Sequence, residues 1–96
     1  MAGSFVVVTT PAFDRLVKGL AKHHPELPEI LANAVATLGL DPLNIRRERQ
    51  IRKLVGPAFG QGQYRLRVGR WRFRYDVEEH VVILHYAGLR REDTYR

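Results

Sequence analysis

Two runs of alternating residues, one on each side of Gly69-Arg70, constrain the fold of this chain more than any other feature. Residues 63–76 read QYRLRVGRWRFRYD, in which apolar and mostly basic side chains alternate with a period of two. This alternation is typical of strands that have one buried and one solvated face. A two-residue loop that begins with glycine fits a type II′ turn, so the segment predicts a β-hairpin. The register gives three apolar cross-strand pairs, namely Val68 with Trp71, Leu66 with Phe73 and Tyr64 with Tyr75.

The opposite face of the predicted hairpin carries arginines in facing positions. The same register places Arg67 opposite Arg72 and Arg65 opposite Arg74. Like charges about 5 Å apart across a strand pair destabilise a sheet. Pairs made with lysine, glutamate or threonine would protect a sheet face from aggregation without that repulsion. The pattern therefore favours a surface that binds a polyanion over an ordinary solvated face.

The distribution of charge along the chain agrees with this interpretation. The 96 residues carry a net charge of +6. Residues 1–45 hold three basic and four acidic side chains, whereas residues 46–96 hold thirteen and six. Only three of the sixteen basic residues are lysines, and the planar guanidinium suits bidentate phosphate binding better than an ammonium does. We expect a sheet face in the C-terminal half to bind RNA.

The N-terminal half predicts one strand followed by two helices. Ser4–Thr9 is rich in valine, and Thr10-Pro11 supplies an N-cap followed by proline at the first helical position. Apolar residues recur at helical spacing from Phe13 to Ala21 and again from Leu27 to Leu38. We expect the two helices to form an antiparallel hairpin on one face of a sheet.

Between the helices and the hairpin the sequence predicts loops. A polar connector contains five basic residues, namely Arg46, Arg47, Arg49, Arg52 and Lys53. The glycine-rich bend at 56–62 lacks the ending of a phosphate-binding P-loop and leads into a strand.

Val81–Tyr86 is apolar on both faces, so we expect a central strand there. The predicted class is α+β, with the N-terminal strand and helix hairpin packed on a mainly antiparallel, twisted, four-stranded sheet.

Length and composition limit the kind of protein further. A chain of 96 residues can bury one hydrophobic core, so we expect residues 1–96 to form a single domain. Because there is no cysteine, disulfide and thiolate sites are excluded, and a reducing cytoplasm is the expected location. The apolar run Phe5–Val8 is far shorter than a signal-peptide core, and no stretch approaches the roughly 20 apolar residues of a membrane span. We expect neither export nor a membrane partner.

Three segments of the second half resemble the RelE/ParE superfamily of bacterial type II toxins. They are RKLVG from Arg52, YRLRVGRWRFRYDV from Tyr64 and VVILHYAGLRREDTYR from Val81. The N-terminal strand and helices match the layout of the family, so the resemblance covers nearly the whole chain. It implies a RelE-like endoribonuclease that cuts mRNA in the ribosomal A site and is neutralised by a cognate antitoxin. It also implies attack of the ribose 2′-hydroxyl on the adjacent phosphorus, with no cofactor and no metal.

The resemblance implies roles for individual residues as well. Arg72, Arg90 and Tyr95 match catalytic positions of the family. Both arginines would hold the scissile phosphate and stabilise its transition state, and Tyr95 would stack on a base or transfer a proton. Arg65 and Arg67 match basic positions on the first hairpin strand and would position the RNA backbone. Three further basic residues are expected to bind RNA, namely Lys53, Arg74 and Arg91.

The identity of the general base stays open at this point. Well-studied RelE-type enzymes have lysines on the first hairpin strand, whereas this chain has arginines, which stay protonated. Tyr95 would need a strongly basic surrounding to ionise. His85 would accept a proton at neutral pH if it faces the arginines, and its side of the strand depends on the length of the turn at Glu78-Glu79. For a histidine on an apolar strand, packing is the default role.

Two other functions stay open beside the ribonuclease. A ParE-like toxin of the same fold would inhibit DNA gyrase without nuclease activity, although it would not need Arg72, Arg90 and Tyr95. A decayed toxin that only binds RNA is the third interpretation. The four histidines and scattered carboxylates show no metal-ligand spacing, so no metal is expected. The expected partners are a cognate antitoxin, the ribosome and mRNA.

Overall fold

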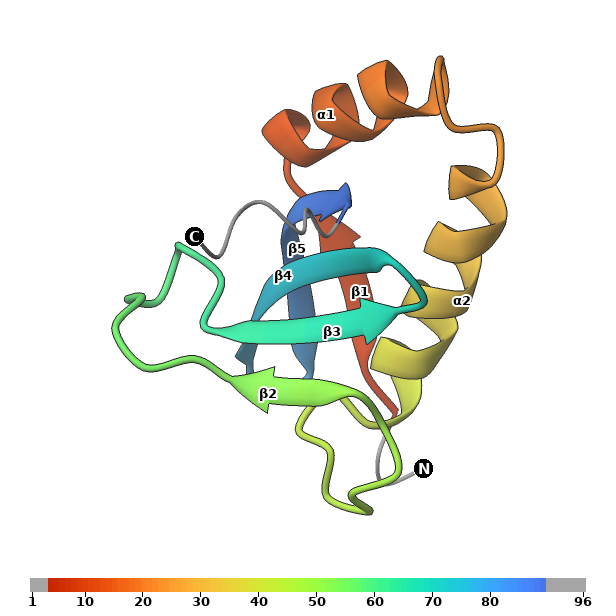
Figure 1. Cartoon of the computed structure of the whole chain (residues 1–96). Coiled ribbons are helices and arrows are strands. Elements are labelled where there is room, and N and C mark those ends of the chain that lie inside the picture. Colours follow the sequence, from red (N-terminus) through yellow and green to blue (C-terminus); the bar gives the residue numbers. More distant parts are fainter. Residues whose placement is uncertain (1–3, 90–96) are drawn as a thin grey trace, which may run out of the picture.

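One mixed sheet and two helices form the fold, which the computed structural model describes for residues 4–89 (Figure 1). The elements are β1 (Val6–Thr9), α1 (Pro11–Ala21), α2 (Leu27–Leu40), β2 (Ile51–Lys53), β3 (Tyr64–Val68), β4 (Trp71–Glu78) and β5 (Val81–Leu89). The five strands lie in the order β1-β5-β4-β3-β2. This arrangement confirms the predicted α+β class and the predicted central position of β5.

The sheet differs from the prediction in two details. It has five strands, because Ile51–Lys53 of the expected polar connector pairs with β3 as β2. A three-residue edge strand that contains two cations is too short to show an alternating pattern. The sheet is also mixed, since β1 pairs in parallel with β5 while the other three pairings are antiparallel. Both helices and three strands separate β1 from β5 in the chain, which leaves room for a parallel crossover.

The helices start where the sequence predicts but are arranged differently. The Thr10 hydroxyl accepts the Phe13 N–H at 3.0 Å, which caps α1 with Pro11 at its first position. Figure 1 shows α1 lying across one end of the sheet and α2 running along it, so the two axes are steeply inclined instead of antiparallel. Each helix thereby covers a different part of the apolar face.

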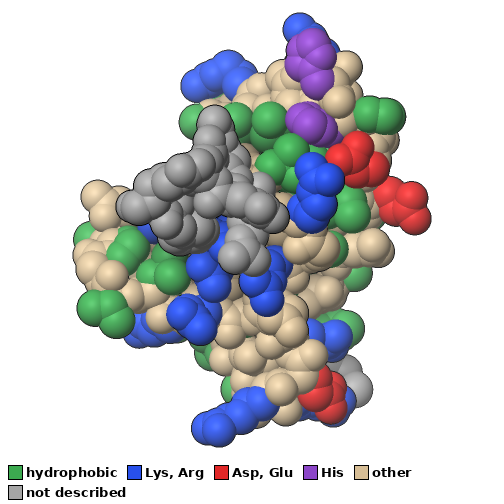
Figure 2. Space-filling view, viewed as in Figure 1, with side chains coloured by type: hydrophobic (Ala, Val, Ile, Leu, Met, Phe, Trp, Pro, Cys, Tyr) green, Lys and Arg blue, Asp and Glu red, His purple; other side chains and the backbone are tan. Residues whose placement is uncertain are grey.

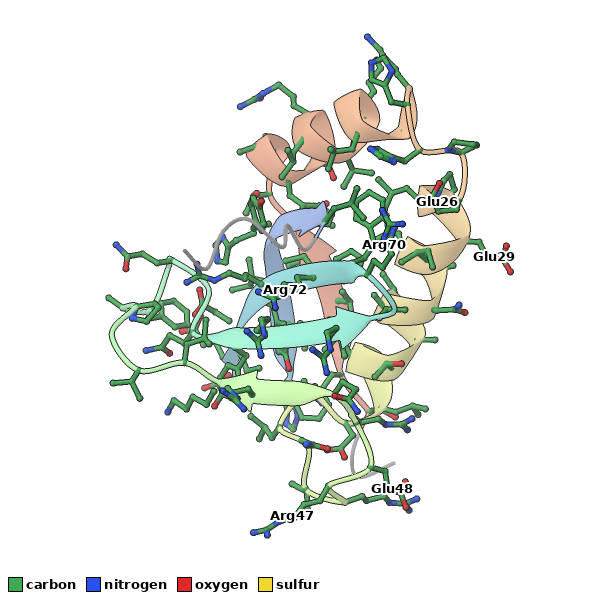
Figure 3. All side chains as sticks on the ribbon, in the orientation of Figure 1. Glu26, Glu29, Arg47, Glu48, Arg70 and Arg72 are labelled. Atoms are coloured by element: carbon green, nitrogen blue, oxygen red, sulfur yellow. The ribbon has the colours of Figure 1, made fainter. Side chains whose placement is uncertain are left out.

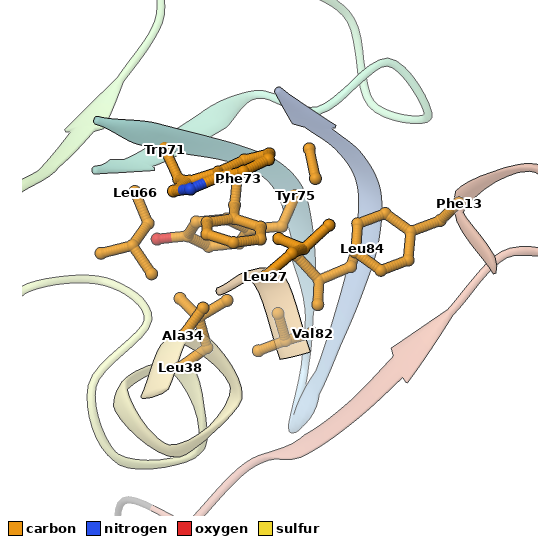
Figure 4. Close-up of a cluster of buried hydrophobic side chains, with 11 residues drawn as sticks. Phe13, Leu27, Ala34, Leu38, Leu66, Trp71, Phe73, Tyr75, Val82 and Leu84 are labelled. Atoms are coloured by element: carbon orange, nitrogen blue, oxygen red, sulfur yellow. The ribbon is translucent and has the colours of Figure 1, made fainter. Parts of the chain in front are cut away.

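The core lies between the helices and the apolar face of the sheet (Figure 4). Its buried side chains are Phe13, Leu27, Ala34, Leu38, Leu66, Trp71, Phe73, Tyr75, Val82, Leu84 and Ala87. The Tyr75 hydroxyl donates to the Pro42 carbonyl at 2.6 Å and so satisfies the polar atom of a fully buried ring. Burial, together with the neighbouring Tyr64 and Asp41, raises the pKa of Tyr75 above its usual value. Tyr75 is therefore a neutral structural residue at physiological pH.

The β3–β4 hairpin has the predicted register. Val68 pairs with Trp71, Leu66 with Phe73 and Tyr64 with Tyr75. Gly69 opens the two-residue turn with a φ of 58°, a conformation that favours glycine. Because the apolar partners face the core, the arginines between them lie on the opposite face of the sheet.

Candidate nucleic-acid interface

Basic side chains from three neighbouring strands lie on the face of the sheet away from the core. Across β3 and β4, Arg67 pairs with Arg72 and Arg65 with Arg74, as predicted. Strand β2 adds Arg52 opposite Arg65, so one row holds an arginine on each of three strands. Figure 2 shows Lys and Arg side chains gathered over this part of the molecule. We call Arg52, Arg65, Arg67, Arg72 and Arg74 the arginine face.

The position of Arg67 is fixed by Gln50, the residue before β2. The Arg67 backbone N–H donates to the Gln50 carbonyl at 2.9 Å, which extends the β2–β3 ladder by one residue. The Arg67 Nη2 donates to the Gln50 Oε1 at 3.2 Å. Backbone and side chain together hold this guanidinium at the β2 side of the face.

Arg74 is used by the fold itself. Its Nε and Nη2 donate to the Gly62 carbonyl at 3.1 and 2.8 Å, so one guanidinium edge clamps the loop before β3. Gly62 has a φ of 85°, and a Cβ there would lie 2.9 Å from the Arg74 Cβ. Only glycine allows this close approach. Arg74 therefore contributes charge to the face while holding the loop in place.

Asp76 holds the same loop from the next position on this face of β4. It is fully buried, and its carboxylate accepts the backbone N–H groups of Gly60, Gly62 and Gln63 at 2.8, 3.1 and 2.9 Å. Burial alone would raise the pKa of Asp76, but these three hydrogen bonds and the nearby His85 outweigh it and lower the pKa below its usual value. Asp76 is therefore a buried carboxylate that stays ionised at physiological pH.

His85 lies beside Asp76, which settles the side of the strand that it occupies. The turn between β4 and β5 is Glu79-His80, with two residues and a φ of 55° at Glu79. Strand β5 has one extra residue, His85, opposite the step from Arg74 to Tyr75. The His85 Nε2 lies 2.8 Å from the Asp76 Oδ2, and the side chain is 21% exposed. His85 therefore borders the arginine face through its contact with Asp76 and lies outside the apolar core.

Tyr86 adds an aromatic ring to the arginine face. It pairs with Arg74 across β4 and β5, and it is 47% exposed. The ring leans along β5 over Gly88, which is itself opposite Arg72. A Cβ at Gly88 would collide with the hydroxyl and ring of Tyr86. The absence of a side chain at Gly88 thus allows a tyrosine to lie among the arginines.

The remaining residues that the sequence predicts to bind RNA or to act in catalysis do not all lie on the arginine face. Lys53 pairs with Tyr64 on the face away from the arginines, and its Nζ lies 5.6 Å from the centre of the Tyr64 ring. Figure 3 shows Arg72 on the strand and Arg70 at the turn beyond it. Three predicted residues, Arg90, Arg91 and Tyr95, lie outside the described residues.

Sequence reasoning missed three residues of this site. The sequence pattern predicts a connector at Arg52 and assigns no role to Tyr86 or Asp76. The signal for Asp76 was its position, since it continues the arginine alternation of β4 with the opposite charge. Tyr86 carried no usable signal, because the extra residue in β5 changes the face to which it points.

Residues 4–89 contain no group of three or more His, Cys, Asp or Glu side chains that could hold a metal ion. Neither of their helices is long and apolar enough to cross a membrane.

Comparison with known proteins supports the fold. No protein-family model and no curated protein matches the sequence. Among solved structures, the chain is similar to one chain of the toxin–antitoxin complex RelBE2 from Mycobacterium tuberculosis, with a TM-score of 0.69 and 18% sequence identity. The match covers 91% of this chain and 99% of that one. The protein therefore has the fold of a chain found in a toxin–antitoxin complex.

Proposed function

We propose that this protein is the toxin of a type II toxin–antitoxin pair and a metal-independent endoribonuclease that cuts mRNA in the ribosomal A site. The observation that carries the proposal is the arginine face, in which Arg67 and Arg72 pair directly and Arg52, Arg65 and Arg74 form a row. Its occurrence on the fold of a toxin–antitoxin chain supports the same function. Such a protein acts in the cytoplasm, where it meets translating ribosomes.

The arrangement fits phosphodiester chemistry that needs charge stabilisation more than a metal. In the proposed reaction the 2′-hydroxyl oxygen attacks the adjacent phosphorus, and the bond from phosphorus to the 5′-oxygen breaks. The products are a 2′,3′-cyclic phosphate and a 5′-hydroxyl. Arg72 offsets the extra negative charge of the pentacoordinate transition state, while Arg65 and Arg67 align the backbone. By the family resemblance, Arg90 would help to hold the scissile phosphate, and Tyr95 would stack on a base or transfer a proton.

His85 is the proposed general base. Arginine stays protonated and cannot accept the proton of the 2′-hydroxyl. His85 is partly exposed, and Asp76 lies 2.8 Å from its Nε2. A neutral imidazole has one ring nitrogen without a proton, and this nitrogen can accept the proton of the 2′-hydroxyl. If Tyr95 is the base instead, removal of the His85 imidazole will leave the cleavage rate unchanged.

The proposed partner is an antitoxin with acidic residues and an amphipathic helix. Its acidic groups would neutralise the arginine face, and its apolar side would cover apolar surface near the helices. Co-expression with the adjacent small open reading frame should yield a stable complex. Absence of any such neighbour would favour a module that only binds RNA.

The decisive experiment adds the purified protein to translating ribosomes and maps the mRNA ends. Codon-phased cuts support the ribonuclease, breaks in DNA that require gyrase support a ParE-like toxin, and neither product supports an RNA-binding module. Arg72→Gln should reduce cleavage by roughly 10²-fold or more, because it removes a charge that acts on the transition state.

Arg70→Gln is the matched control, because Arg70 is exposed at the hairpin turn only two residues away and loses the same charge. It should cleave at nearly the parent rate. Equal losses in the two variants would show that total charge matters and that Arg72 has no special role.

A further inference from the structure

A hollow of about 170 Å³ lies at the β2 end of the arginine face. Arg49, Gln50, Ile51, Arg52, Arg65 and Arg67 line it. Four of these six residues carry a guanidinium, and of the described residues that line the hollow none is acidic. Its polar and cationic walls fit a small, strongly charged anion better than an apolar ligand.

Arg49 is held in place by the loop before β2. Asn44 accepts the Arg49 backbone N–H at 3.1 Å through its Oδ1 and donates to the Arg49 carbonyl at 3.2 Å through its Nδ2. Asn44 has a φ of 57°, a conformation that asparagine tolerates better than most residues. The backbone of Arg49 is therefore fixed before any ligand arrives, which lowers the entropic cost of binding.

The Arg49 side chain also carries a polar atom that the fold leaves unsatisfied. Its Nε is shielded from water and has no hydrogen-bond partner within residues 4–89. A buried donor in this state is unfavourable unless a ligand accepts its hydrogen bond. An anion in the hollow would provide such an acceptor.

We propose that this hollow is a second phosphate-binding subsite, which holds a backbone phosphate of the RNA away from the scissile bond. It rests on the proposed function, because it takes Arg72 on β4 as the site of the reacting phosphate. Strands lie about 4.8 Å apart, so β2 is roughly 10 Å from β4, a distance that one strand of RNA spans along its backbone. The subsite contributes binding and register and takes no part in the chemical step.

The test compares RNA binding by Arg49→Gln and Arg52→Gln with binding by the parent protein. The probes are a fluorescent single-stranded RNA of twelve nucleotides and a dinucleoside monophosphate, which has one phosphate. Each variant should bind the long RNA more weakly, and its salt slope should fall by about 0.7 units, as expected for loss of one phosphate contact on a single strand. The dinucleoside monophosphate can occupy only one of the two phosphate sites, so its binding should weaken less in Arg49→Gln than binding of the long RNA does.

Arg46→Gln is the matched control, because Arg46 lies on the same loop, is exposed and does not line the hollow. It should keep the parent salt slope. Arg52 is exposed on a short edge strand, so Arg52→Gln should fold. This variant can therefore test the subsite even if Arg49→Gln does not fold.

The outcomes separate the subsite from the catalytic proposal. Unchanged slopes in both variants, slopes equal to that of Arg46→Gln, or no binding of the long RNA by the parent would overturn the subsite. Cleavage on ribosomes that depends on Arg72 would stand in any of these cases. Conversely, the parent protein could fail to cleave mRNA on ribosomes while Arg49→Gln and Arg52→Gln still show reduced salt slopes. This result would overturn the proposed nuclease activity and support the phosphate-binding subsite.

Discussion

Replacing Asp76 with asparagine should strongly destabilise the fold. The carboxylate accepts one N–H through Oδ1 and two through Oδ2. Asparagine has one acceptor oxygen, so at least one of the three N–H groups loses its partner and faces an NH₂ group. A buried donor left unsatisfied costs about 1–3 kcal/mol, and the remaining bonds weaken because they no longer involve a charge. We expect a loss of about 2–4 kcal/mol in the free energy of unfolding, from the same terms.

Chemical denaturation followed by circular dichroism at pH 7 measures this loss. For a domain of this size each kcal/mol lowers the melting temperature by roughly 4–8 °C, so thermal unfolding should show the effect clearly. Glu78→Gln is the control, because Glu78 is exposed at the end of β4 and should change stability by at most about 0.5 kcal/mol.

The difference between parent and Asp76→Asn should depend on pH. Because the pKa of Asp76 is lower in the folded than in the unfolded chain, its contribution is complete above the unfolded value near 3.8 and is lost as the pH falls through the folded value. The difference in stability between the two proteins should therefore begin to shrink as the pH falls below about 4 and continue to shrink toward the lower folded pKa. A loss under about 0.5 kcal/mol at pH 7, or a loss that does not change down to pH 3, would refute the hydrogen-bonding argument.

Three other substitutions test the geometry around the arginine face. Gly62→Ala should destabilise the fold by about 1–3 kcal/mol in a denaturant titration, because alanine is strained at positive φ and crowds the Arg74 side chain. Arg74→Gln should lower the free energy of unfolding by about 1.5–3 kcal/mol, whereas Arg52→Gln should leave it nearly unchanged; equal effects would contradict the clamp on the loop. Gly88→Ala should displace the flexible ring of Tyr86 at little cost in stability. It should weaken binding of single-stranded RNA about as much as Tyr86→Ala does. The loss in binding free energy should reach roughly 1–3 kcal/mol if the ring stacks on a base.

The hairpin shows which structural information the sequence carries most clearly. Its period of two and its glycine-first turn gave the correct pairing of Arg67 with Arg72 and of Arg65 with Arg74. Local rules suffice there, because turn length and alternation together set both register and face. The start of α1 was equally predictable, since Thr10 and Pro11 are local capping signals.

Non-local contacts account for what the sequence did not reveal. Strand β2 has only three residues and exists because Gln50 and Ile51 pair with β3 across a loop of ten residues between the two strands. The side of His85 depends on a turn of two residues and one extra residue in β5, and neither has a sequence signature. Asp76 continues the polar alternation of β4, but its burial is not predictable from the sequence, because its partners are backbone groups that no residue type encodes.

Hydrogen bonds and a nearby carboxylate help the fold to accommodate the positive charges of the arginine face. Arg74 donates to the Gly62 carbonyl, Arg67 donates to Gln50, and the buried Asp76 carboxylate places a negative charge on the same side of β4. The contacts of Arg67 and Arg74 fix these two side chains without neutralising them, since an amide and a carbonyl carry no net charge. A surface whose cations are held in place loses little entropy when it binds a polyanion. The proposed reaction at phosphorus would use preorganised charge of this kind to stabilise its transition state, and this use would account for the facing arginines.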